Sequence, residues 1–383
     1  MSAIVLPKPR TDYAIIRYWY KIAKFLAYTP ITPESQHKTS MYVSTLYPPV
    51  LFLIYLLATL FSFYERLFFI YKHFNISQCI LDALQGAVES LFIEHAVILS
   101  LLKRENWKKL MNSIAKLERS LNWSWINQVP DSSLRMICLK IFMYHLVYAS
   151  IHVYDTIVNW TTLSYSLAFI IFRFTTYYLM FSTLFIIFIC GWLHNRYLYL
   201  EELLKSSGST RYFKFSIVRN ESVLEKLSEF SQNYKNMYLI VQEINAVFGT
   251  CFFFITICTV LEILNAVNYG MPTKNLGVEN AVTGVNVTYL LLYTICNVQV
   301  VMSCNAVLKC SKKIWITCLM LHQQTETAEI REVYLILSHF IKGLSPEFSA
   351  AGFWMVNQSV LSTLFSSVMT YLIIIIQFNM TLI

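Results

Sequence analysis

Seven apolar stretches dominate the chain, and each is long enough to cross the hydrocarbon layer of a membrane as a helix. A layer of roughly 30 Å needs about 20 helical residues. The stretches lie near 45–64, 77–102, 135–160, 162–195, 238–267, 285–308 and 353–379. With 56% hydrophobic and only 14% charged residues, the chain cannot form an ordinary soluble surface. The sequence therefore predicts an all-α membrane protein with seven transmembrane helices.

The distribution of basic residues orients these predicted helices. Lys and Arg gather in the N-terminal segment and after the second, fourth and sixth apolar stretches, whereas the opposite loops hold only Arg66, Lys72 and Lys274. Basic loops stay on the cytoplasmic side of a membrane, so the N-terminus is predicted to be cytoplasmic and the C-terminus extracellular. The net charge of +8 then reflects this cytoplasmic bias, and we expect no nucleic-acid partner.

Several other classes of membrane protein fit the sequence less well. The predicted orientation is inverted relative to G-protein-coupled receptors, and Leu134 to Lys140 contain no Asp-Arg-Tyr-like element. Metalloprotease His-Glu spacing, a Gly-rich phosphate loop and a nucleophile elbow are absent from the sequence, so we predict no enzyme, cofactor or metal site. A multipass transporter remains an alternative, although it would usually show two related halves.

Glycosylation sequons on or near the outer side begin at Asn75, Asn159 and Asn286.

The last apolar stretch carries polar residues along one predicted helical face. They are Ser359, Thr363, Ser366, Thr370 and Gln377. One interpretation is close helix packing, with the hydroxyls bonded to their own backbone. The other is a pore lining, in which a ring of Ile373, Ile374 and Phe378 closes by excluding water. An amide at membrane depth requires water or a polar partner along this face.

The same stretch resembles a known receptor family. Thr370-Tyr371, five aliphatic residues and Gln377-Phe378 form a motif similar to the C-terminal signature of insect gustatory receptors, which are related to insect odorant receptors. Gly352-Phe353 resembles the lead-in to the final helix of that family. The resemblance implies a tetrameric, non-selective cation channel whose pore is surrounded by the final helix of each subunit. Gln377 and Phe378 would lie at or near the extracellular gate, with Thr370 and Tyr371 bracing the helix.

This resemblance also implies a domain organisation and a set of partners. Residues 1–44 would form a cytoplasmic segment, 45–311 six helices with an outer ligand pocket, 312–352 a cytoplasmic anchor helix, and 353–383 the pore helix with a short extracellular tail. Inner extensions of the fourth to sixth helices would complete the anchor. The implied partners are a small-molecule tastant, the lipid bilayer, and either identical subunits or other gustatory receptors, without an obligate G protein. The implied location is the plasma membrane of sensory neurons.

Polar residues in the outer halves of the predicted helices are candidates for a ligand pocket. The candidates are Asp82, Glu89, Tyr148, His152, Asp155, Trp160, Arg173, Thr176, Glu262, Asn265, Tyr289 and Tyr293. Gln85 shares a helical face with Asp82 and Glu89. Ionisable residues at membrane depth usually pair with one another or line a water-filled cavity. We expect about half of the candidates to be structural ion pairs between helices or snorkelling side chains near the headgroups instead.

The ligand class is only partly constrained. Sugar receptors of the resembled family tend to carry an acidic residue directly after the Thr-Tyr pair, where this chain has Leu372. We therefore expect bitter or other non-sugar compounds, with a fructose-like or other sugar receptor as the alternative.

Overall fold

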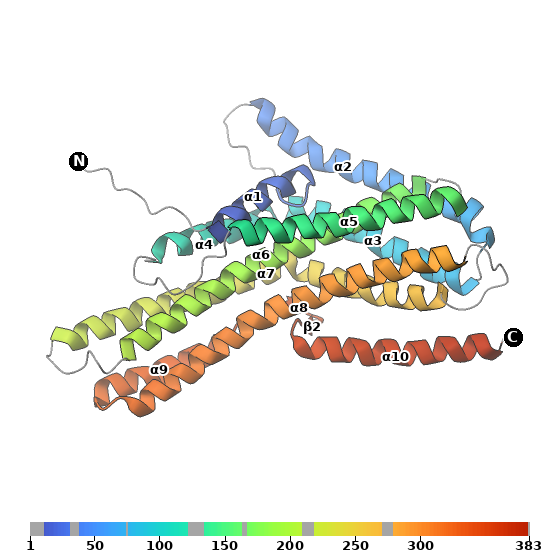
Figure 1. Ribbon diagram of the computed structural model, residues 1–383. Coiled ribbons are helices and arrows are strands. Elements are labelled where there is room, and N and C mark those ends of the chain that lie inside the picture. Colours follow the sequence, from blue (N-terminus) through green and yellow to red (C-terminus); the bar gives the residue numbers. More distant parts are fainter. Residues whose placement is uncertain are drawn as a thin grey trace.

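The computed structural model describes residues 11–30, 38–73, 76–121, 134–162, 167–208, 218–269 and 279–381. Among these, long helices dominate (Figure 1). The helices are α1 (Thr11–Phe25), α2 (Lys38–Glu65), α3 (Ile76–Leu102), α4 (Arg104–Ser120), α5 (Leu134–Thr162), α6 (Leu167–Gly208), α7 (Val218–Tyr269), α8 (Glu279–Gln324), α9 (Ala328–Gly343) and α10 (Gln358–Thr381). Short helical turns η1 (Arg66–Ile70) and η2 (Tyr71–His73) follow α2, and strands β1 (Ser349–Ala350) and β2 (Trp354–Met355) pair antiparallel before α10.

Helix α6 lies at the centre of the bundle, and α2 lies at its surface. In the most apolar window of α6, 78% of the residues are buried, against 11% in the stretch Leu46–Phe69 that covers α2 and η1. An apolar helix that is buried all round belongs to a core. An apolar helix that leaves Leu53, Leu57 and Leu60 exposed needs an apolar solvent. The membrane supplies that solvent.

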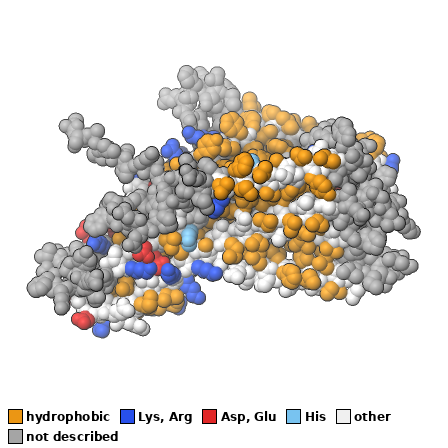
Figure 2. All heavy atoms as spheres, viewed as in Figure 1, with side chains coloured by type: hydrophobic (Ala, Val, Ile, Leu, Met, Phe, Trp, Pro, Cys, Tyr) orange, Lys and Arg blue, Asp and Glu red, His pale blue; other side chains and the backbone are white. Residues whose placement is uncertain are grey.

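The surface divides into an apolar part and a charged end. Figure 2 shows hydrophobic side chains over much of the visible face, while charged side chains gather toward the end where α9 lies. Five helices of the described residues are long and apolar enough to cross a membrane, and Gln358–Ile374 in α10 is a shorter apolar stretch. The prediction of an all-helical membrane protein is therefore confirmed. The number of crossings and the orientation stay predictions.

Helix α4 was not predicted from the sequence. The segment after the second apolar stretch was expected only as a basic loop, yet it forms 17 helical residues. Trp107, Leu110, Ile114 and Leu117 recur at helical spacing and are buried in the core. The exposed lysines on the opposite face account for the polar overall composition of the helix.

The range 312–352, expected as one anchor helix, contains several elements. Helix α8 continues to Gln324, and α9 then folds back against it. The side chains of Ile330, Tyr334, Leu337 and Ile341 form the buried face of α9. The hairpin of β1 and β2 follows, so that α10 begins at Gln358 rather than at 353. The start of α10 is capped, because Asn357 Oδ1 accepts a hydrogen bond from the Ser359 amide at 3.0 Å.

One side chain of α7 fixes this hairpin to the bundle. Asn245 Nδ2 donates to the Glu347 carbonyl at 2.6 Å, and Asn245 Oδ1 accepts from the Ser349 amide at 3.0 Å. One turn further along α7, a Cβ atom on Gly249 would lie 3.2 Å from the Ala351 nitrogen, so glycine permits the close approach. The entry to α10 is therefore held by α7.

Candidate functional site

Four buried polar side chains from α3 and α7 form one hydrogen-bonded group, which we call the acid cluster: Gln85, Glu89, Glu262 and Asn265. Gln85 Nε2 donates to Glu89 Oε1 at 3.1 Å and also to the carboxylate of Glu262. Asn265 Nδ2 in turn donates to Gln85 Oε1 at 2.6 Å. Since Gln85 and Glu89 are four residues apart, both point from the same face of α3 toward α7.

Helices α6 and α8 complete the surroundings of this cluster. Tyr293 Oη donates to Glu89 Oε1 at 2.6 Å, and Thr175 Oγ1 donates to Glu89 Oε2 at 3.2 Å. Thr176 is hydrogen-bonded to Tyr293 Oη at 3.3 Å. Glu89 therefore receives hydrogen bonds from three helices. They replace many of the hydrogen bonds to water that its carboxylate loses on burial.

A second group, the arginine cluster, joins α5, α6 and α8: Tyr148, His152, Asp155, Arg173 and Tyr289. Arg173 Nε lies 3.0 Å from Asp155 Oδ2, and Tyr289 Oη donates to the same carboxylate oxygen at 3.2 Å. Tyr148 Oη donates to the Arg173 carbonyl at 2.7 Å, and its ring lies 3.9 Å from that of His152. His152 Nδ1 is 3.1 Å from Tyr289 Oη.

Asp82 belongs to neither cluster. It forms an ion pair with Arg66 and accepts a hydrogen bond from Tyr71 Oη at 2.9 Å. Arg66, Glu89 and Thr175 border a small void of about 10 Å³, together with Ser62 and Gly86. Such a space holds roughly one water molecule. The polar side chains therefore fill the interior of this region themselves.

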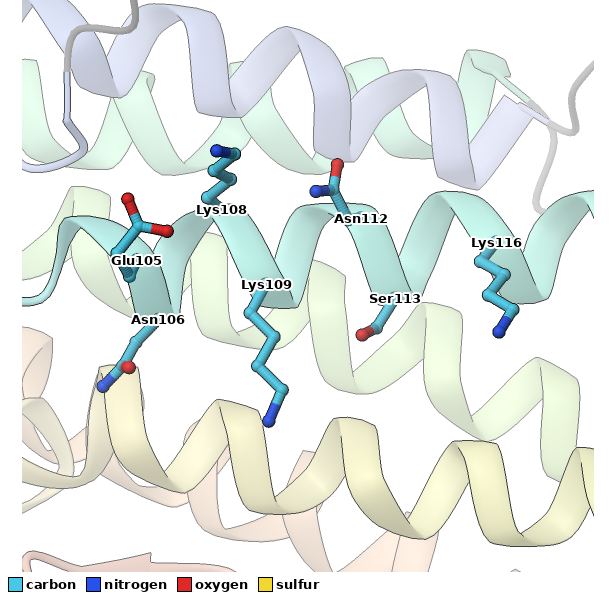
Figure 3. A pocket seen from close by; sticks show the side chains of 7 residues that line it. All are labelled: Glu105, Asn106, Lys108, Lys109, Asn112, Ser113 and Lys116. Carbon is cyan, nitrogen blue, oxygen red and sulfur yellow. The ribbon is translucent and has the colours of Figure 1, made fainter.

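A larger hollow of about 430 Å³ lies along the exposed face of α4 (Figure 3). Its lining residues are Glu105, Asn106, Lys108, Lys109, Asn112, Ser113 and Lys116. Lys109 is 71% exposed and lies 3.6 Å from Glu243 of α7. This open, basic groove includes none of the residues predicted to bind a ligand.

The predicted pore face on α10 is exposed. Ser359, Thr363, Ser366, Thr370 and Gln377 are all exposed, whereas Val368 is buried against the bundle. Thr363 Oγ1 donates to the Ser359 carbonyl at 3.2 Å and Thr370 Oγ1 to the Ser366 carbonyl at 3.0 Å. Both threonines thus bond to their own backbone, as the packing interpretation expects.

Apolar residues of α10 are exposed as well. Ile373 is 53% exposed, Ile374 41% and Tyr371 56%, while the side chain of Phe378 lies outside the described residues. A helix with exposed polar and apolar faces needs more than one kind of neighbour. Tyr371 lies off the hydroxyl face, where lipid can cover it, whereas Ile373 and Ile374 follow Thr370 by three and four residues and share its face. Water or another protein chain must cover that face.

Comparison with known proteins identifies the family. The sequence matches the family described as 7tm Chemosensory receptor over residues 16–382. The chain belongs to the 7tm chemosensory receptor family. This receptor is therefore a multi-pass membrane protein of a chemosensory family rather than an enzyme. Comparison with curated proteins gives no match.

Solved structures show the fold of the receptor. The insect olfactory receptor OR5 from Machilis hrabei, in complex with eugenol, aligns with a TM-score of 0.58 at 13% identity, covering 96% of this chain and 100% of that one. A second structure of OR5 from Machilis hrabei aligns with a TM-score of 0.53 at the same identity and coverage. The arrangement of helices is thus that of an insect olfactory receptor, although few residues are shared.

Most of the residues predicted to bind a ligand in the receptor lie close to one another, but they mainly contact each other. Arg173 and Asp155 form an ion pair, and a role for either residue in ligand binding stays a prediction. Trp160 and Asn159 have side chains outside the described residues, Asn75 lies outside them entirely, and Asn286 lies within α8. Sequence reasoning missed Arg66 and Thr175. Arg66 had been assigned to a loop, and Thr175 offered only its position beside Thr176.

Replacing Arg173 with Ala is expected to destabilise the receptor by about 3 kcal/mol, because the buried carboxylate of Asp155 would lose its base. The measurement is the fraction of receptor at the cell surface. A second variant, Arg173→Ala with Asp155→Ala, removes the orphaned charge and should recover much of that fraction. Normal surface delivery with weaker agonist potency would instead place Arg173 in contact with the ligand.

Proposed function

We propose that this receptor is a gustatory receptor that acts as a tastant-gated, non-selective cation channel in the plasma membrane of chemosensory neurons. Bitter or other non-sugar compounds are the proposed tastants, because Leu372 replaces the acidic residue typical of sugar receptors. The motif Thr370-Tyr371 to Gln377-Phe378 supports the gustatory rather than the odorant branch. OR5 is described in complex with eugenol, which supports a small organic ligand.

The observation that carries the channel proposal is the exposure of the polar face of α10. Helix α2 is equally uncovered, but its exposed face is apolar and suits lipid. Helix α10 instead exposes six serine and threonine residues and Gln377. In a membrane, this face requires water or other subunits, and a central pore shared by four copies supplies both. Ile373, Ile374, Gln377 and Phe378 are the proposed gate.

The proposed orientation places the N-terminus in the cytoplasm and the C-terminus outside, with seven crossings. The end of the bundle that holds α9 is then cytoplasmic, which agrees with its charged surface (Figure 2). The acid and arginine clusters then lie in the outer half, where a tastant could reach them. Subunits would meet through the cytoplasmic parts of α6, α7, α8 and α9, as a homotetramer or with other gustatory receptors.

Two-electrode voltage clamp on cells that express this chain alone tests the proposal. We expect a cation current evoked by at least one compound from a panel of sugars and bitter plant compounds, and the current should persist when G-protein signalling is blocked. A C-terminal tag accessible from outside intact cells checks surface delivery and orientation together. A current that disappears when G proteins are blocked would contradict a directly gated channel.

A further inference from the structure

The ionisable residues around the two clusters do not balance in charge. Among the described residues, Arg66 forms an ion pair with Asp82, and Arg173 forms one with Asp155. Glu89 and Glu262 form no ion pair within that part of the chain. Arg66 also acts electrostatically on Glu89, yet its guanidinium is already bound to Asp82. In this part of the chain, Glu89 and Glu262 therefore have at most one nearby cation, Arg66, and that cation already forms an ion pair with Asp82.

Burial makes this imbalance costly. Glu89 is 2% exposed and Glu262 3% exposed, so bulk water stabilises neither charge. The two carboxylates also act on each other, since the amide of Gln85 is hydrogen-bonded to both. Gln85 Nε2 supplies one N–H to each carboxylate but carries no charge. It therefore fills the place of a cation without neutralising the pair.

The acid cluster also contains a buried acceptor without a hydrogen bond within the described chain. Asn265 is 5% exposed, and its Oδ1 atom accepts no hydrogen bond from the described residues. Its Nδ2 atom lies 2.6 Å from Gln85 Oε1, so the free oxygen belongs to the acid cluster as well. Buried acceptors are seldom left unpaired. Two carboxylates and an unpaired amide oxygen together call for a cationic N–H donor.

We propose that the acid cluster binds the protonated amine of the ligand, which displaces the Gln85 amide from between Glu89 and Glu262. The proposal rests on the proposed function and names the chemical class of its tastant. An ammonium group would bring the N–H donors that Gln85 now provides, together with the missing positive charge. A metal ion fits less well, because no group of three or more His, Cys, Asp or Glu residues in the described chain could hold one.

The position of the cluster connects it to the channel. Gln85 lies nine residues from the start of α3, or about 14 Å along the helix, so a ligand that opens a path from that end would reach the cluster after between two and three helical turns. Glu262 lies on α7, which also carries Asn245, the residue that holds the hairpin before α10. Displacing Gln85 would release Glu262 from α3. Any resulting shift of α7 would act directly on the entry to α10.

The test measures binding to the purified, full-length receptor by its thermal unfolding temperature. The probes are matched amines and alcohols of the same shape: tyramine with tyrosol, tryptamine with tryptophol, and phenethylamine with phenylethanol. We expect at least one amine to stabilise the receptor more than its alcohol does.

Glu262→Gln should weaken binding of that amine by about tenfold or more and leave binding of the matched alcohol unchanged. Gln85→Lys, which tethers an ammonium group in the cluster, should abolish the preference for the amine.

A matched control lies on the same helix. Glu243 of α7 is also buried, but it pairs with Lys109 and accepts a hydrogen bond from Ser113, away from the cluster. Glu243→Gln should leave the preference for the amine intact. The proposal is overturned if no amine is preferred over its alcohol, or if the preference survives in both cluster variants. If the receptor binds an amine but gives no current, the proposed channel function is contradicted and the proposed amine site is supported. The failure of one proposal can therefore be distinguished from the failure of the other.

Discussion

Arg196→Met is expected to cost this receptor about 3–5 kcal/mol of stability, the range for breaking a buried ion pair. Arg196 is fully buried on α6, and its Nε and Nη2 atoms lie 3.1 and 2.5 Å from Oε2 of Glu118 on α4. Trp192 Nε1 donates to the same oxygen at 3.3 Å. The variant leaves the Glu118 carboxylate buried without a base. The measurement is the amount of monodisperse receptor after detergent extraction, together with its unfolding temperature.

Lys205→Met provides the control for this prediction. Lys205 is 43% exposed, and its partner Glu201 keeps a second ion pair, 3.0 Å from Lys313. Because Glu201, although buried, keeps Lys313 as a partner, losing this partly exposed lysine should cost less than about 1 kcal/mol. The double variant Arg196→Met with Glu118→Leu should recover most of the loss, because an apolar pair needs no solvation. Equal effects of Arg196→Met and Lys205→Met would show that α4 is not held to the bundle by this ion pair.

The helices of the membrane region were predictable because the length of an apolar stretch has a direct physical meaning. The stretch 77–102 becomes α3 within one residue, since a membrane requires about that many helical residues. Outside the membrane this rule gives no boundary. Helix α8 continues to Gln324, although the sequence from Lys309 onward is no longer apolar enough to mark a span. Helix α4 was missed for the same reason, although the spacing of Trp107 and Leu110 carried the signal of a buried face.

The sequence singled out most of the polar residues that meet in the two clusters, but it did not predict their pairings, and their role in ligand binding stays a prediction. Ionisable side chains such as Glu89 and Glu262 are expensive at membrane depth, so their importance follows from sequence alone. The sequence alone, however, allows Arg173 to pair with any acidic residue among the ligand-pocket candidates. Its pairing with Asp155 depends on how α5 rotates against α6. The acid cluster likewise forms only where Gln85 contacts Asn265, and these two residues lie on helices that are far apart in the sequence. Only the packing of the bundle determines these contacts.

Phe378→Ala is expected to raise the basal current of the receptor by about tenfold or more. In the proposed pore, four copies of Phe378 narrow the outer end of the pathway beside Ile373 and Ile374, and an apolar constriction stops ions because it loses its water. Removing the four phenyl groups widens the constriction, so that water remains in it. If the variant destabilises the closed state relative to the open state by about 1.4 kcal/mol, the ratio of open to closed channels rises tenfold. The measurement is leak conductance per receptor at the cell surface, without ligand.

Phe365→Ala is the matched control, because it removes the same ring from the same helix. Phe365 lies in the first half of α10, is 68% exposed and lies on the side away from the hydroxyl face. Its removal should leave basal current near the value of the unaltered receptor. A rise in both variants would indicate a general loosening of α10. No rise in Phe378→Ala, with normal surface delivery and an unchanged agonist response, would place the gate elsewhere along the pathway.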